Sequence, residues 1–387
     1  MARKRGRGKI FAGAGEVGTG FAVYVGSDRV FHQKREVLIL NVAILGCGAM
    51  GTVLGAYMTK NGCPVEMIDS YQAHVDALNA KGAHIVGEVD MTVPVKAITP
   101  EQMHGIYDIV FLFTKQLANA EVLPKLLPHL GPDSTVCTLQ NGVPEPFVAE
   151  FVGERRTVGG TVLWGATFQG PGVSELTQDI TKSTHLFEVG EIDGSIGERI
   201  RRVASVLEYM GPTMVSDGLM DSRWSKLVNN ACMSGMSAVC GCTFGEVLDN
   251  PKARACLSYI GREVKVCCEA EGHKLHPLLS MPEPPLCLAL KSQAEFDESQ
   301  QMFLDTYEGL RPAKASMLQD LEHDRPTEVR MINGYVCQTG KKHGIPTPFN
   351  DKVVEIVEAI GAGKLPLAMS NLDLFDPSWF PYEFYKA

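Results

Sequence analysis

The stretch VLILNVAILGCGAMG, residues 37–51, joins an aliphatic run to a glycine-rich loop. A nearly continuous aliphatic run is typical of a parallel strand that is covered on both faces. In the loop, Gly46 permits a tight turn, Gly48 lets the backbone approach a pyrophosphate, and Gly51 allows a helix to pack closely on the strand. A helix-compatible segment follows at residues 52–61, and its N-terminus would face the phosphates. The stretch therefore predicts the first strand, loop and helix of a dinucleotide-binding Rossmann domain.

An acidic residue stands where such a domain contacts the ribose of its cofactor. A second predicted strand, residues 64–68, ends at Asp69, about 20 residues beyond the loop. Its carboxylate can accept hydrogen bonds from both ribose hydroxyls and would repel a 2′-phosphate, and no Arg or Lys follows at residues 70–72. This favours NAD(H), with NADP(H) as the alternative. The predicted cofactor contacts in this part of the chain are Gly46, Cys47, Gly48, Ala49, Met50, Gly51 and Asp69.

Further strands are predicted at residues 108–113, 134–139 and 158–164, with helical segments between several of them. This alternation predicts an α/β domain with a doubly wound parallel sheet. Ligands of such sheets bind beyond the carboxyl ends of the strands. Two polar clusters follow successive strands there, Thr114-Lys115-Gln116 and Gln140-Asn141-Gly142. Either cluster alone is compatible with a solvated loop, but the pair favours contact with cofactor and substrate.

After about Asp217 the strand signals fade, and the remaining sequence predicts an all-helical domain. Residues 224–234 predict a helix on which Lys226, Asn230 and Ser234 recur every four residues and so share one face. Their neighbours are mostly apolar. A polar stripe of this kind is either a solvated face or the wall of a polar cleft, and spacing alone favours the solvated face.

A second polar segment reads SMLQDLEHDRPTE, residues 316–328. Thr327 is expected to cap a helix that continues through Val336, with Glu328 in its first turn, where the helix dipole favours an anion. Glu is common at helix starts for that reason alone, so its position does not by itself assign a function.

Composition excludes several classes of protein. A net charge of −9 over 387 residues argues against a nucleic-acid-binding surface. No apolar run approaches the roughly 18 residues that span a bilayer. The 11 cysteines are scattered, without C-x-x-C pairs, which predicts reduced thiols in a cytoplasmic protein and no metal site.

The first forty residues begin with the basic run MARKRGRGK and show no steady period. We expect a poorly ordered extension, since little in it can be buried. It contains Gly13-Ala-Gly15-Glu-Val-Gly18, which fits G-x-G-x-x-G but lacks a buried strand before it, so this match is discarded. The predicted organisation is this extension (1–40), a Rossmann domain (41–217) and a helical domain (218–387).

These motifs resemble the ketopantoate reductase (2-dehydropantoate 2-reductase) family over about residues 41–360. The resemblance is carried by GCGAMG (46–51), TK (114–115), QNG (140–142), W-x-K-L-x-x-N (224–230), SMLQD-x-x-x-x-R-x-T-E (316–328) and ING followed by HGIPTP. It implies a Rossmann domain followed by a helical domain like the C-terminal one of the 6-phosphogluconate dehydrogenase superfamily. It also implies NAD(P)H-dependent reduction of a small 2-keto acid, in this family 2-dehydropantoate to pantoate in pantothenate biosynthesis.

The resemblance implies roles for single residues as well. Lys226 matches the general acid that protonates the C2 oxygen, and Glu328 matches the carboxylate that orients substrate and pairs with the lysine. Hydride addition builds negative charge on that oxygen, and a lysine can supply the proton when burial lowers its pKa. Lys115 and Asn141 match positions that contact the cofactor and the reacting centre, and Asn230 and Ser316 match substrate-binding positions. Ser234 is expected at the substrate as well, one turn after Asn230.

The sequence departs from the family pattern in four places. Ser234 stands where the family commonly has a second substrate-facing asparagine, and Asp69 stands where many members hold NADPH with a basic residue. Residues 276–311 read as an insertion or a lengthened helix near the cleft, and the tail after Gly363 falls outside the pattern. A different 2-keto acid therefore remains open as the substrate.

Two further alternatives remain open, another dehydrogenase of the same superfamily and a non-catalytic dinucleotide sensor. Retention of Lys226, Glu328 and Asn230 argues against the sensor. A homodimer is also left open.

Overall fold

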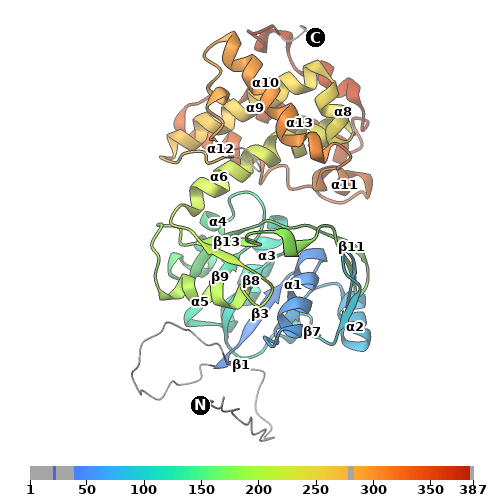
Figure 1. The fold of residues 1–387 in the computed structure, drawn as a ribbon, viewed down its shortest axis with the longest axis vertical. Coiled ribbons are helices and arrows are strands. Elements are labelled where there is room, and N and C mark those ends of the chain that lie inside the picture. Colours follow the sequence, from blue (N-terminus) through green and yellow to red (C-terminus); the bar gives the residue numbers. More distant parts are fainter. Residues whose placement is uncertain (1–20, 23–38, 278–282, 384–387) are drawn as a thin grey trace, which may run out of the picture.

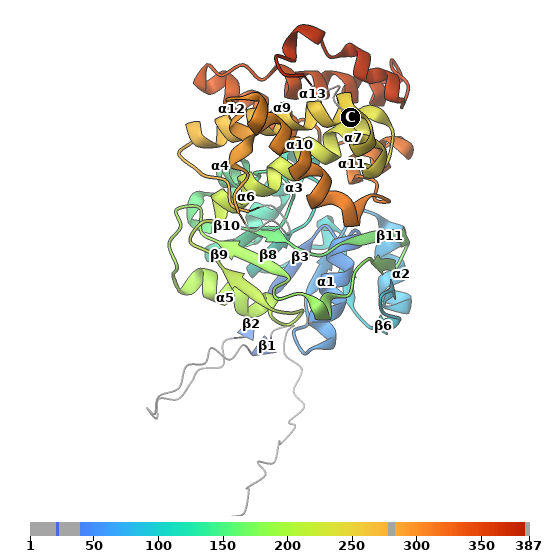
Figure 2. The same ribbon diagram turned by 45° about the horizontal axis from the view of Figure 1, so that its top comes forward.

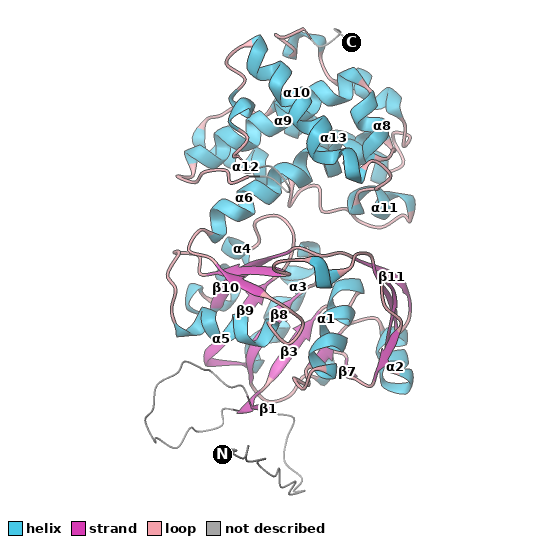
Figure 3. Cartoon of the chain, in the orientation of Figure 1, coloured by secondary structure: helices cyan, strands magenta, loops and turns pink. Residues whose placement is uncertain are grey.

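The computed structural model describes residues 21–22, 39–277 and 283–383. Within these residues the N-terminal half carries the sheets and the C-terminal half is all helical, and the two stack along the long axis of the molecule (Figures 1 and 3). The last described strand ends at Val215 and the first helix of the helical half begins at Leu219. The fold is thus a parallel-sheet Rossmann domain followed by a helical domain, as predicted.

The large sheet has eight strands, and the six from β10 to the edge strand β7 are parallel to one another. In spatial order the strands are β14 (Thr213–Val215), β13 (Phe187–Gly190), β10 (Thr157–Val162), β9 (Leu130–Thr138), β8 (Tyr107–Leu112), β3 (Val42–Leu45), β4 (Glu66–Ile68) and β7 (Lys96–Ile98). Strand β13 runs antiparallel to β10. The first strand of this sheet in chain order, β3, lies in its middle. The chain adds β4 and β7 on one side of β3 and then returns to add β8, β9 and β10 on the other, so the strand order reverses between β3 and β8. This reversal is the point at which doubly wound sheets bind their ligands.

Both faces of the sheet are covered, as the aliphatic strands require. Successive residues of β3 point to opposite sides, so that Val42 and Ile44 join one core while Ala43 and Leu45 join the other. The first core is covered by α1 (Ala49–Lys60), α2 (Gln72–Lys81) and α5 (Glu198–Leu207), and the second by α3 (Asn119–Leu126) and α4 (Glu145–Val152).

Two smaller sheets were not anticipated from the sequence. A four-stranded sheet in the order β11, β12, β5, β6 lies beside α1 and α2 (Figure 1). Its strands are β5 (Ala83–Gly87), β6 (Met91–Val93), β11 (Ala166–Gly170) and β12 (Val173–Leu176). A two-residue strand β1 (Phe21–Ala22) also pairs antiparallel with β2 (Ile39–Leu40). The rest of the predicted 1–40 extension, with the discarded glycine motif, lies outside the described residues.

The helical half packs around the long helix α9 (Pro251–Ala270). The other helices are α6 (Leu219–Asn229), α7 (Gly235–Cys240), α8 (Phe244–Asp249), α10 (Gln293–Tyr307), α11 (Ser316–Glu322), α12 (Asn333–His343) and α13 (Pro348–Gly361). Helices α6 and α11 lie on the side that faces the sheet (Figures 1 and 2). None of the helices in the described ranges is long and apolar enough to cross a membrane.

In one segment the structure differs from the expectation, and in two others it shows what the sequence had left open. Thr327 and Glu328 lie in an irregular segment and residues 329–332 form turns, so Thr327 is not a cap, and α12 begins only at Asn333. The segment 276–311, in its described part, contains the additional helix α10, which packs against α9. The tail after Gly363 folds back on the helical core, where Phe375 is fully buried.

Candidate active site

The glycine loop has the conformation and the space that a dinucleotide needs. Gly46 has φ of +99°, and a side chain there would overlap the backbone of Thr114 on the neighbouring strand end. A Cβ on Gly51 would overlap the carbonyl oxygen of Gly46. A Cβ on Gly48, in contrast, would meet no protein atom within 4 Å. The open side of the loop therefore lies at Gly48, at the N-terminus of α1, where backbone N–H groups favour phosphate.

A histidine that the sequence analysis did not single out forms a hydrogen bond with the backbone of this loop. His74 on α2 is 1% exposed, and its Nδ1 accepts a hydrogen bond from the backbone N–H of Gly172. Its Nε2 therefore carries the proton and donates to the carbonyl oxygen of Cys47 at 2.7 Å. Burial lowers the pKa of His74, which keeps the ring neutral. Cys47 is fully buried, and its contact with a cofactor stays a prediction.

Asp69 lies at the carboxyl end of β4, the strand next to the glycine loop. Its Oδ1 accepts a hydrogen bond from the backbone N–H of Tyr71 at 2.9 Å, and the side chain is half-buried. Its negative charge raises the pKa of Cys47, and at His74 it partly offsets the lowering of the pKa by burial. The residue thus stands beside the loop with its carboxylate held in place, as a ribose-binding residue would.

The two polar clusters meet at the carboxyl ends of β8 and β9. The side chain of Gln140 donates a hydrogen bond to the backbone carbonyl oxygen of Thr114 at 2.6 Å. The side chain of Gln116 donates one to the backbone carbonyl oxygen of Asn141 at 2.5 Å. The predicted cofactor residues Lys115 and Asn141 are therefore brought together with the glycine loop, through the contact of Gly46 with Thr114.

Glu328 reaches this place from the helical half, 212 residues further along the chain than Gln116. Its Oε1 accepts the backbone N–H of Gln116 at 2.8 Å. Burial raises the pKa of the Glu328 carboxyl, against the lowering effects of that hydrogen bond and of Lys115. Lys115 itself lies 2.5 Å from the carboxylate of Asp320 on α11. Both contacts join the helical half to the loop that follows β8.

Lys226 lies on α6, which packs against β10 and β13. Its Nζ donates a hydrogen bond to the carbonyl oxygen of Val162, the last residue of β10, at 2.9 Å. Burial, followed by the positive charge of Arg223, lowers the pKa of Lys226 to about 8. The expected pairing with Glu328 is absent among the ion pairs of the described residues. Instead, the Lys226 ammonium donates a hydrogen bond to a neutral carbonyl, and the Glu328 carboxylate accepts one from a backbone N–H.

The polar stripe of α6 is partly buried and is not the solvated face that spacing favoured. Lys226, Asn230 and Ser234 are all half-buried. Residues 230–234 form a π-helical turn, a distortion that is frequent at functional sites. The side-chain nitrogen of Asn230 is buried without a hydrogen-bond partner, although such groups are normally paired. Ser316 is exposed at the start of α11, which packs against this turn.

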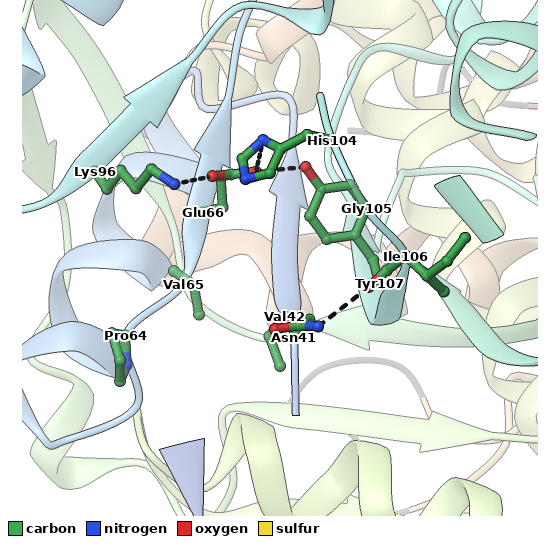
Figure 4. Close-up of a pocket in the computed structure, with 10 residues that line it drawn as sticks. All are labelled: Asn41, Val42, Pro64, Val65, Glu66, Lys96, His104, Gly105, Ile106 and Tyr107. Atoms are coloured by element: carbon green, nitrogen blue, oxygen red, sulfur yellow. Dashed lines mark hydrogen bonds and ion pairs between the residues drawn. The ribbon is translucent and has the colours of Figure 1, made fainter. Parts of the chain in front are cut away.

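A cavity of about 250 Å³ lies elsewhere, at the amino ends of the sheet strands (Figure 4). Its buried Glu66 is already paired with Lys96 at 2.5 Å and bonded to the hydroxyl of Tyr107. The polar groups of this cavity therefore bind one another, and it lies at the opposite edge of the sheet from the glycine loop.

Comparison with known proteins follows the same division of the chain. A family model described as ketopantoate reductase PanE/ApbA matches residues 42–190, and one described as the C-terminal part of that family matches residues 218–361. The 2-dehydropantoate 2-reductase of Streptococcus pyogenes serotype M1 is 27% identical over 321 residues, covering 82% of this chain and 97% of the relative. That of Pyrococcus abyssi is 29% identical over 316 residues, covering 80% and 94%.

Solved structures share the fold. A D-mandelate dehydrogenase with NADH and anilino(oxo)acetate superposes with a TM-score of 0.70 at 23% identity, covering 84% of this chain and 99% of that one. A PanE/ApbA family ketopantoate reductase from Ralstonia eutropha JMP134 gives the same TM-score, identity and coverage.

Proposed function

Because the chain belongs to the ketopantoate reductase family, we propose that Lys226 is its general acid in the NAD(P)H-dependent reduction of a 2-keto acid. The observation that carries this proposal is the partly buried Lys226 ammonium at the carboxyl end of β10, with a pKa lowered to about 8. A general acid works best when its pKa is near the working pH. The family activity is the reduction of 2-dehydropantoate to pantoate, so 2-dehydropantoate is the first substrate to test.

The residues around the glycine loop fit a nicotinamide dinucleotide. The open space at Gly48, the N-terminus of α1 and the carboxylate of Asp69 would hold its pyrophosphate and ribose. When bound there, the reduced cofactor supplies the hydride. Asp69 favours NAD(H), because its charge would repel a 2′-phosphate and accept hydrogen bonds from the ribose hydroxyls.

The residues of the helical half would bind and protonate the keto acid. The unpartnered amide of Asn230, with Ser234 and Ser316, would hold the substrate. Lys226 would donate its proton to the C2 oxygen as charge develops there. Glu328 would keep Gln116, and with it the cofactor loops, in register with the helical half. The scattered cysteines favour a cytoplasmic protein, since all 11 are free thiols.

A second candidate is reduction of a different 2-keto acid. Ser234 is smaller than the asparagine that the family commonly places there, which would leave room for a bulkier C3 substituent. The neighbouring D-mandelate dehydrogenase suggests an aryl 2-keto acid as the comparison substrate.

Assaying the purified protein against 2-dehydropantoate and a panel of 2-keto acids, each with NADH and NADPH, tests the proposal. We expect oxidation of the cofactor together with formation of the 2-hydroxy acid. Binding of NADH without turnover of any 2-keto acid would identify a sensor and contradict the proposal.

A further inference from the structure

A buried ion pair ties the helix of Lys226 to the sheet. Arg223, one turn before Lys226 on α6, is 1% exposed, and Glu145, the first residue of α4, is fully buried. The Nε of Arg223 donates to the Glu145 carboxylate at 2.7 Å. Gly159 on β10 makes room for this carboxylate, because a Cβ there would overlap it. Apolar side chains of similar volume often give a protein the same stability as a buried ion pair or more. Stability alone therefore does not explain this pair.

The same guanidinium also holds the ends of the cofactor-binding strands. It donates to the carbonyl oxygen of Gln140 at 2.6 Å and to that of Thr138 at 3.0 Å. The side chain of Gln140 in turn donates to Thr114, which contacts Gly46 of the glycine loop. One side chain of the helical half therefore reaches the loops on which the cofactor would rest.

We propose that Arg223 is a positioning residue, which clamps the helix of the proton donor onto the cofactor loops and keeps a fixed positive charge one turn from Lys226. Glu145 holds that charge in place. The inference rests on the proposed role of Lys226, because it assigns Arg223 a function only through that residue.

The fixed charge has a defined effect on Lys226. Residues three apart on a helix are neighbours, and a like charge disfavours the protonated lysine. Arg223 accordingly lowers the pKa of Lys226, second to burial. Burial raises the pKa of Glu145, and the Arg223 charge opposes this and keeps the carboxylate as its counterion.

Other charged groups lie on the elements around α6. On β13, Glu188 accepts a hydrogen bond from Ser222 at 2.5 Å. On α6, Asp221 lies 3.1 Å from His273 and 3.5 Å from His276. Glu328 lies on the loop before α12. All of these remain in every variant below, so their effects on the Lys226 pKa cancel in the comparison.

Substitutions at the two ends of the pair separate a charge effect from a structural one. Arg223→Met removes the like charge and leaves the carboxylate, so the pKa of Lys226 should rise by roughly half a pH unit or more. Glu145→Gln leaves the cation unpaired, so the same pKa should fall. Arg223→Lys keeps the charge and should leave the pKa near that of the wild type. A purely structural role would lower the melting temperature in both charge-removing variants without opposite pKa changes.

The pKa is measured directly by NMR titration of the full chain with 15N-labelled lysine, with the Lys226→Arg variant assigning the signal. Opposite shifts in Arg223→Met and Glu145→Gln support the inference, and shifts in the same direction or none overturn it. If either single variant fails to fold, the double variant Arg223→Met/Glu145→Gln replaces it. This variant should still raise the Lys226 pKa, and an unchanged pKa overturns the inference. The titration needs no substrate, so absence of reductase activity would contradict the proposed function and leave this result standing.

Discussion

The ammonium group of Lys226 donates a hydrogen bond to the carbonyl oxygen of Val162 at 2.9 Å, which joins a helix of the C-terminal half to the last parallel strand of the N-terminal half. A carbonyl holds the ammonium in place without the strong rise in pKa that a carboxylate partner would cause. Burial and Arg223 therefore set the acidity of the group, with a pKa of about 8. A lysine of this kind is protonated at neutral pH and can still release its proton.

The first prediction concerns pH. A general acid must carry its proton, so kcat/KM for ketone reduction should be level below about pH 8 and fall roughly tenfold per pH unit above it. Initial rates with saturating NADH across the range from about pH 6 to pH 10 measure this limb. In Lys226→Arg the limb should disappear, because a guanidinium keeps its proton. A wild-type profile that stays level up to about pH 10 would show that Lys226 does not titrate as the acid.

The second prediction separates the glycines of the loop. A Cβ on Gly48 meets no protein atom within 4 Å, so Gly48→Ala should keep the wild-type melting temperature. The same methyl group would occupy the space of the pyrophosphate, and the Kd for NADH should rise about tenfold or more. Gly46→Ala is the comparison, since its positive φ and its contact with Thr114 predict a loss of stability. Wild-type NADH affinity in Gly48→Ala would place the cofactor elsewhere.

The third prediction concerns cofactor preference. Asp69→Asn removes the charge that repels a 2′-phosphate, so the ratio of kcat/KM with NADPH to that with NADH should rise about tenfold. Asp133→Asn, at an exposed position in β9, is the control with the same change of charge. An equal ratio in Asp69→Asn and the wild type would mean that Asp69 does not select the cofactor.

The fourth prediction concerns Glu328. In Glu328→Gln the amide oxygen can still accept the N–H of Gln116, so the fold should survive while the negative charge is lost. A neutral amide accepts this hydrogen bond more weakly than a carboxylate, so the loop at Gln116 is held less firmly. We expect kcat to fall by about tenfold or more, with little change in melting temperature. Glu322→Gln, an exposed carboxylate at the end of α11, should behave as the wild type. If Glu328→Gln and Glu322→Gln give the same kcat, the Glu328 charge has no part in the reaction.

The glycine loop was predictable because its signals are local. The aliphatic strand, the spacing of Gly46, Gly48 and Gly51, and Asp69 at the next strand end lie within one short stretch of sequence. Local backbone requirements fix the glycines, and the structure confirms the parallel sheet that the stretch implies.

The predictions that failed depended on contacts between distant parts of the chain. The face of α6 that carries Lys226 resembled a solvated face, because its burial comes from the packing of α6 on distant elements such as β10 and β13. Glu328 was expected to start a helix, whereas its carboxylate binds Gln116, 212 residues away. Arg223 went unnoticed because its partner Glu145 lies 78 residues earlier. Periodicity within one element carries no information about such partners.

The most direct test of the central claim is the turnover of Lys226→Ala with NADH and the best 2-keto acid of the panel, measured beside the NADH Kd. The proposed mechanism predicts a kcat at least about 10²-fold below the wild type with an unchanged Kd, since only the proton donor is lost. A kcat close to the wild type, with the cofactor still bound, would contradict the assignment of Lys226 as the acid.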